Sequence, residues 1–164
     1  LEHDISLFTY HIPLDAHQEL GNNWPSAKLL GWTDLEPFGQ HHGEMIGVKG
    51  RCPSMSREEF RCGLEAFYGR DAQVVFAGPR TIKTCALISG GAHKWIDEAI
   101  KDEIDCFVTG TSDEPIWHIA HEEKINFMAL GHAATEKIGV QLLGSHLAEY
   151  FNLSHHFIDD NNPF

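Results

Sequence analysis

Short apolar runs alternate with amphipathic stretches through the second half of the chain. Three apolar runs have the length of buried strands: residues 84–89, 104–109 and 125–130. Each is followed by a stretch with the spacing of a helix: residues 92–101, 113–123 and 133–150. Strands that alternate with helices in this way indicate right-handed βαβ units and a largely parallel sheet. The pattern therefore predicts an α/β fold.

The first half has shorter signals. Residues 5–10 are rich in β-branched and aromatic residues and predict a strand, which Pro13 ends. Three further segments have strand character: residues 35–49, 74–76 and 157–159. We expect one helix over residues 24–30. A second should begin after Ser54 or Ser56 and end near Gly69.

Composition narrows the class of protein. The formal net charge is −12 over 164 residues, which disfavours binding of nucleic acid by the overall field. No run approaches the ~18 apolar residues of a membrane span. No signal peptide is visible, and the chain starts without Met, as a fragment or a processed form would. The four cysteines form no Cys-x-x-Cys pair, so no disulfide framework and a cytoplasmic location are expected. Cys85 and Cys106 lie in apolar strand-like runs and are expected to be buried thiols.

His132 and Glu136 are the strongest candidates for chemistry. They follow a predicted strand and lie four residues apart, so a helix places them on one face, with about 6 Å of rise between them. A histidine and a carboxylate at the carboxyl end of a strand can share a metal ion or a polar substrate. Spacing alone also fits an ordinary surface pair, which is the commoner case.

His11 and Asp15 form a second candidate pair. They lie where the predicted first strand ends, and α/β folds place their chemistry at such ends. An aspartate suits a hard or borderline divalent cation. Taken alone, Asp15 is better explained as the cap of the next turn.

Other features carry weaker signals. Gly90 and Gly110 follow strands and open helices, where backbone N–H groups can hold an anion, although tight turns explain them better. His118 falls on the helix after Gly110 and is either buried or directed toward a site. His41 and His42 would point to opposite faces of an extended segment, which favours a solvated loop over a metal site.

Several motifs, in this order and spacing, match one known family across nearly the whole chain. They are YHIPLDA at 10–16 with GNN at 21–23, SGGA at 89–92, DCFVTG at 105–110, GHAATE at 131–136, and FID at 157–159 with NP at 162–163. With them the chain resembles the dinuclear-metal-centre hexameric proteins, also called type 2 homologues of GTP cyclohydrolase I or Ngg-interacting-factor-three-like proteins.

The resemblance implies two similar α/β domains with βαβ units and mixed or parallel sheets, assembled as a toroidal homohexamer. Residues 31–130 would form the second domain. Residues 1–30 and 131–164 would form the remainder of the first, metal-site domain, whose N-terminal segment would be absent from this chain. The resemblance also implies two divalent metal ions per subunit between the domains. His and carboxylate ligands accept zinc, iron, manganese or nickel, so the metal stays open.

Carried over by position, Asp15, His132 and Glu136 match metal ligands of the family. His11 matches a histidine close to the metals, and we expect His11 or His118 to transfer protons. The family's two adjacent histidine ligands belong to a His-His-Gly motif upstream of the first strand. The similar motif of this chain, HHG at 41–43, lies downstream of Asp15 and is therefore not equated with it.

One further departure is Thr111, which stands where the family usually has Glu. The function implied is metal-dependent hydrolysis of a purine nucleotide or a related small molecule. Two alternatives stay open: a metal-binding scaffold or regulatory ring without turnover, and a ring that handles single-stranded nucleic acid. Dispersed Lys and Arg residues count against the last.

Overall fold

The computed structural model describes residues 2–160 and 162. Six strands form one sheet in the order β1-β2-β4-β5-β6-β3. They are β1 (Thr33–His41), β2 (Glu44–Ser56), β3 (Gln73–Phe76), β4 (Thr81–Ile88), β5 (Cys106–Thr109) and β6 (Asn126–Ala129). Only β4, β5 and β6 run parallel, and the other neighbours are antiparallel. The α/β fold is confirmed, with a mixed sheet whose parallel part is its centre.

Seven α-helices accompany these strands in the described residues. They are α1 (Ile12–Ala16), α2 (Asn23–Leu29), α3 (Arg57–Tyr68), α4 (Ile96–Lys101), α5 (Pro115–Glu123), α6 (His132–Thr135) and α7 (Lys137–Phe151). A 3-10 turn, η1 (His93–Trp95), leads into α4. The predicted helices at 24–30, 92–101 and 113–123 are thus found as α2, α4 and α5, with shifted ends.

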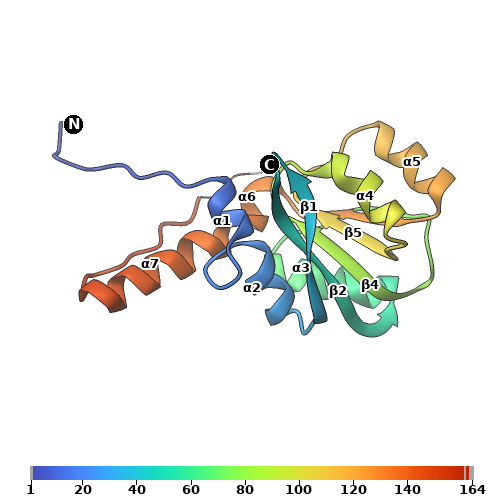
Figure 1. Cartoon of the computed structure of the whole chain (residues 1–164), viewed down its shortest axis with the longest axis horizontal. Coiled ribbons are helices and arrows are strands. Elements are labelled where there is room, and N and C mark those ends of the chain that lie inside the picture. The colour runs from blue at the N-terminus through green and yellow to red at the C-terminus, as the bar shows by residue number, and fades with distance from the viewer. Residues whose placement is uncertain (1, 161, 163–164) are drawn as a thin grey trace.

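Helices cover both faces of the sheet (Figure 1). On one face, apolar residues of α2 and α3, such as Ala27 and Leu64, share a core with Leu87 and Val108. On the other face, Ile96 of α4 and residues of α5 pack with alternate residues of the same strands. Because both faces are covered, β5, β6 and the second half of β4 are buried at every residue and mostly apolar, as buried parallel strands are.

Local sequence explains where α3 begins and ends. The Ser56 hydroxyl accepts a hydrogen bond from the Glu59 N–H, and the Glu59 carboxylate accepts one from the Ser56 N–H. This reciprocal pair satisfies two N–H groups that would otherwise lack partners at the helix start. Gly69 adopts a left-handed conformation, with φ of 66°, and ends the helix. Of the two caps considered, Ser56 is therefore the one used.

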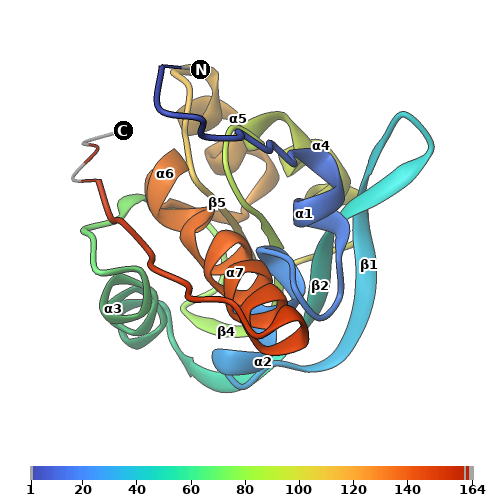
Figure 2. The same cartoon turned by 90° about the vertical axis from the view of Figure 1, so that its left-hand side faces the viewer.

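Two predicted strands are wrong. Residues 5–10 pair with no strand among the described residues, and they run out from α1 with their apolar side chains exposed, Leu7 to 86% (Figure 1). Residues 157–159 likewise form no strand, and the tail folds back along α7, where Lys137 and Asp159 form an ion pair (Figure 2). A β-like composition is not enough when no neighbouring strand offers hydrogen-bond partners.

The predicted helix 133–150 is also interrupted. Glu136 has φ of −109° and ψ of 6°, which separates α6 from α7. Cys85 and Cys106 are buried free thiols, which confirms the expectation for these two cysteines.

None of the helices in the described part of the chain is both long and apolar enough to cross a bilayer.

The position of the sheet in the sequence can be compared with the predicted domain boundaries. All strands of the described residues lie between Thr33 and Ala129, within the predicted second domain 31–130. The flanking segments contribute α1, α2, α6 and α7. The assignment of these flanking segments to a separate first domain stays a prediction.

Candidate metal centre

The parallel strands β4, β5 and β6 are each followed by a turn, and these three turns, at Gly90, Gly110 and Gly131, lie in contact at the carboxyl ends of the strands. The Gly110 N–H donates to the Gly90 carbonyl at 2.9 Å, and the Gly131 N–H donates to the Gly110 carbonyl at 2.8 Å. A Cβ on Gly110 would lie 2.7 Å from the Gly90 carbonyl oxygen and 2.8 Å from the His132 Cα. The three turns are therefore in direct contact, and α6 starts from the last of them.

Polar side chains from both ends of the chain converge above these turns. His11 precedes α1, Asp15 lies within it, and Glu136 lies between α6 and α7. One ligand atom of each lies within 4.8 Å of the others, which makes the three a group that could hold a metal ion. His132 joins them through Glu136, because its Nε2 lies 3.2 Å from Glu136 Oε1. The break after α6 does not separate this predicted pair.

Asp15 is held in place by neighbouring side chains. It is buried, and its Oδ1 accepts hydrogen bonds from Asn22 Nδ2 at 2.8 Å and from Ser89 Oγ at 3.0 Å. Asn23 Nδ2 donates to the Asp15 carbonyl at 3.2 Å and to the Ile46 carbonyl at 2.7 Å. These bonds fix the carboxylate before any ligand arrives, as is typical of groups that surround metal ligands.

The electrostatics of Glu136 follow from its surroundings. Burial raises the pKa of the Glu136 carboxyl above its usual value, and the nearby Asp15 carboxylate raises it further. The imidazoles of His132 and His11 act in the opposite direction on the same pKa. Two carboxylates that face each other in a partly buried site repel, and a divalent cation bound between them would relieve that repulsion. The donor set of carboxylate and imidazole suits such a cation.

Gly90 is required by the close approach of the candidate ligands. Its φ is +68°, and a Cβ there would overlap Glu136 Oε1 and lie 3.0 Å from His132 Nε2. The Gly90 N–H is also occupied, since it donates to Thr135 Oγ1 at 2.9 Å. Of the two explanations for this glycine, an anion site and a tight turn, the structure fits the tight turn.

Gly90→Ala should therefore weaken metal binding. The added methyl group displaces the Glu136 carboxylate, and we expect the affinity for Mn²⁺ to fall about tenfold or more, as when a group that orients a ligand is lost. Isothermal titration calorimetry measures this. Gly69→Ala is the matched control, because Gly69 has nearly the same φ, +66°, but no atom within 4 Å of a Cβ. Equal metal affinities in the two variants would contradict the packing argument.

The other candidate histidines lie elsewhere. His118 is exposed on α5 and does not belong to the metal-ligand group of the described residues. His41 and His42 lie at the tip of the β1–β2 hairpin, where their rings contact edge to face at 4.4 Å between centroids. They do not point to opposite faces as predicted, because His42 has a positive φ of 48° at the turn.

Sequence reasoning missed the residues that support the site. Asn22 donates to Asp15 and accepts, through its Oδ1, a 2.8 Å hydrogen bond from the Gly139 N–H of α7. It therefore joins the α1 and α7 segments. Ser89 and Asn23 are bonded to each other through the Ser89 N–H and Asn23 Oδ1 at 2.7 Å. The GNN and SGGA motifs contain all three residues, so the motifs marked their positions but not their roles.

Comparison with known proteins supports the resemblance. The family model described as Duf34/NIF3 (NGG1p interacting factor 3) matches residues 1–163. A protein of Chlamydia muridarum named GTP cyclohydrolase 1 type 2 homolog is 47% identical over 165 residues, covering 100% of this chain and 65% of that protein. A protein of the same name from Pseudomonas aeruginosa is 40% identical over 164 residues, covering 99% of this chain and 65% of that protein.

Solved structures agree. The structure described as protein ybgI has a TM-score of 0.92 and 36% identity, and it covers 100% of this chain and 65% of its own. Reduced HcgD from Methanocaldococcus jannaschii, with a TM-score of 0.78, 22% identity and coverage of 93% and 60%, supports the fold alone. The chain spans 65% of the length of the first curated relatives that it matches. On these grounds the chain belongs to the Duf34/NIF3 family.

Proposed function

We propose that the protein binds divalent metal ions through Asp15, His132 and Glu136 and uses them to hydrolyse a small molecule. The observation that carries the proposal is the convergence of donor atoms from the two ends of the chain, with His11, Asp15 and Glu136 within 4.8 Å of one another. Two divalent ions per subunit remain the expected number. Assembly as a homohexamer is part of the same proposal.

Some of these residues would bind the metal ions, and another would transfer protons. Asp15 and Glu136 would balance the charge of the cations and set their spacing, while His132 would supply an imidazole nitrogen. A bound divalent cation lowers the pKa of water toward neutral and polarises the group that is attacked. His11 is the member of the group placed to accept or donate a proton, because it is exposed at the rim while Asp15 is buried.

The substrate class is proposed from the relatives. Their name, GTP cyclohydrolase 1 type 2 homolog, makes GTP the first compound to test. Ring opening of a purine nucleotide is a hydrolysis, which the proposed metal centre suits. A local site is needed to bind a polyanionic nucleotide, because the net charge of the chain is −12.

Turnover of GTP by the metal-loaded protein tests the proposal. We expect product formation with Mn²⁺, Zn²⁺, Ni²⁺ or Fe²⁺, and loss of activity by about a hundredfold or more in His132→Ala, because a metal ligand is removed. His121→Ala is the control, since His121 lies on α5 and its Nδ1 bonds only locally, to the Trp117 carbonyl. His118→Ala in the same assay tests the predicted catalytic role of His118.

Other outcomes have a clear meaning. Stoichiometric metal without turnover of any small molecule would favour the scaffold or regulatory ring. Salt-sensitive binding of single strands would favour the nucleic-acid ring. Less than one ion per chain in the metal-loaded protein would contradict the proposal as a whole. Light scattering after size exclusion measures the proposed hexamer.

A further inference from the structure

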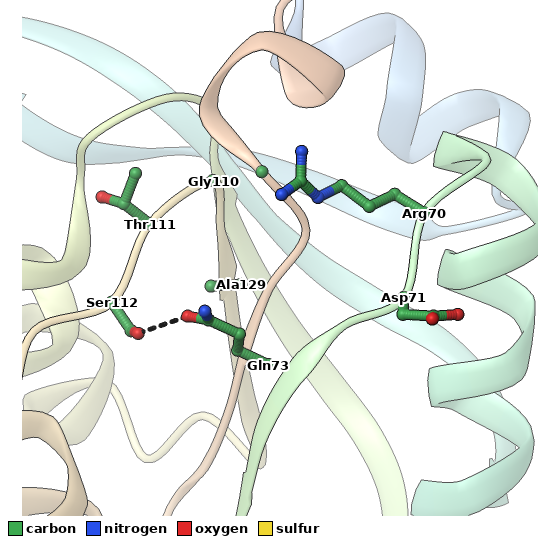
Figure 3. A pocket seen from close by; sticks show the side chains of 8 residues that line it. Arg70, Asp71, Gln73, Gly110, Thr111, Ser112 and Ala129 are labelled. Carbon is green, nitrogen blue, oxygen red and sulfur yellow. Dashed lines mark hydrogen bonds between the residues drawn. The ribbon is translucent and has the colours of Figure 1, made fainter. Parts of the chain in front are cut away.

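A pocket of about 480 Å³ lies beside the candidate metal centre. Its walls come from the residues that follow β5 and β6, including Gly110, Ser112 and Gly131, and from Arg70 and Gln73 on the other side (Figure 3). A volume of this order suits a small-molecule ligand. None of the proposed metal ligands lines it, so its role is separate from that of the ligand set.

The antiparallel pairing of β3 explains how Arg70 comes to this place. Gln73, the first residue of β3, pairs with Ala129, the last residue of β6. The start of one strand therefore lies at the carboxyl end of the other. Gly69 ends α3 immediately before Arg70, so the chain turns from the helix into the pocket wall. The fold thus brings a cationic side chain to the edge of the sheet where the site lies.

Arg70 packs directly on the backbone that leads to His132. A Cβ on Gly131 would lie 2.8 Å from Arg70 Cδ and 2.9 Å from its Nε and Nη1. Arg70 Nη1 also donates to the Asn162 carbonyl at 3.3 Å. Figure 3 shows the guanidinium directed toward Gly110. These contacts place the positive charge of Arg70 on the wall of the pocket next to the metal centre.

The remaining wall, as far as the described residues form it, is mostly polar. Ser112 Oγ donates to Gln73 Oε1 at 2.7 Å, which sets the orientation of the Gln73 amide (Figure 3). Thr111 contributes a neutral side chain. The carboxylate of Asp71, which also lines the pocket, is directed toward α3 rather than toward Ser112 (Figure 3). An arginine and neutral hydrogen-bonding groups around a pocket suit an oxyanion.

We propose that this pocket binds an oxyanion group of the substrate, a phosphate or a carboxylate, with Arg70 as its anchor. The inference rests on the proposed function, because the pocket would hold one end of the molecule that is hydrolysed at the metal centre. Gly131 touches Arg70 and His132 follows it, and consecutive Cα atoms are about 3.8 Å apart. The substrate class is therefore a small molecule whose anionic group lies within a few bonds of the bond that is cleaved.

Binding of inorganic phosphate and of acetate to metal-free protein tests this assignment. Removing metal with a chelator first ensures that no anion binds through a cation. We expect Arg70→Met to weaken phosphate binding about tenfold or more, since charge-assisted hydrogen bonds are lost. Arg70→Lys should lose less, because it keeps the charge but not the planar fork. Calorimetry measures both, and comparison of the two anions shows which oxyanion the pocket prefers.

Two variants separate this result from other causes. Arg61→Met removes a cation that pairs with Glu65 on α3, and it should bind phosphate as the unaltered protein does. His132→Ala should lose metal but keep phosphate, so failure of the metal proposal and failure of the pocket proposal are distinguishable. Absence of phosphate and acetate binding by the unaltered protein, or equal affinity in Arg70→Met, overturns the assignment.

Discussion

We expect Asp15→Asn to lower the affinity of the protein for Mn²⁺ or Zn²⁺ by about a hundredfold or more, because it removes the charge of a proposed ligand and not merely a group that orients one. The substitution keeps the shape of the side chain, and its amide oxygen can still accept hydrogen bonds from Asn22 and Ser89. We therefore expect metal binding to weaken while the fold is retained. Calorimetric titration measures the metal affinity, and circular dichroism on heating measures the stability of the fold.

The control for Asp15→Asn is Asp159→Asn. Asp159 is an exposed carboxylate that pairs with Lys137 and does not belong to the candidate metal-ligand group. Its substitution therefore removes the same charge without removing a proposed ligand. We expect it to leave metal affinity unchanged, since surface ion pairs contribute little. If Asp15→Asn binds metal as tightly as Asp159→Asn does, Asp15 is not a ligand and the proposed centre is wrong.

Phe107→Ala destabilises the protein by about 3–5 kcal/mol, the usual loss for a fully buried aromatic residue. Phe107 is in the middle strand of the parallel part of the sheet and has no exposed surface. Its ring lies 6.0 Å from the ring of Phe38 on one side and 6.0 Å from that of Phe127 on the other. Removal of the ring leaves a cavity between these neighbours that a rigid sheet closes only in part. Urea unfolding gives the change in free energy.

Trp117→Ala is the matched aromatic control. Trp117 is 56% exposed on α5, so its truncation should change the free energy of unfolding by only about 0.5–1 kcal/mol. A similar loss in the two variants would mean that burial does not govern stability here. A loss below about 1 kcal/mol in Phe107→Ala would show that the core repacks around the vacancy.

The centre of the fold was predictable because local pattern and tertiary environment agree there. The strands at Cys106–Thr109 and Asn126–Ala129 are mostly apolar and are buried at every residue, because both faces of the sheet are covered. Residues 5–10 have the same local character, but their structure depends on a partner strand, which composition cannot reveal. The antiparallel edge strand β3 was found as a strand, yet its neighbour β6 is fixed only by the packing of the whole chain.

The sequence marked the candidate ligands of the site but not the residues that surround them. Motif spacing marked Asp15, His132 and Glu136, and the structure brings His11 and Asp15 to Glu136 across the whole length of the sequence. Arg70 was missed because it belongs to no motif and precedes a strand, whereas sequence reasoning looked for chemistry after strands. The hydrogen bond from the Gly139 N–H to Asn22 was missed for a similar reason, since it joins segments more than a hundred residues apart.

The bridge through Asn22 has a consequence for the protein during its synthesis. Asp15 leaves the ribosome early, but Glu136 and Gly139, which complete its surroundings, are added more than a hundred residues later. Until residues 136–139 have been added, the nascent chain lacks one carboxylate of the candidate group and the N–H that binds Asn22, so the candidate site can form only after most of the chain has been made.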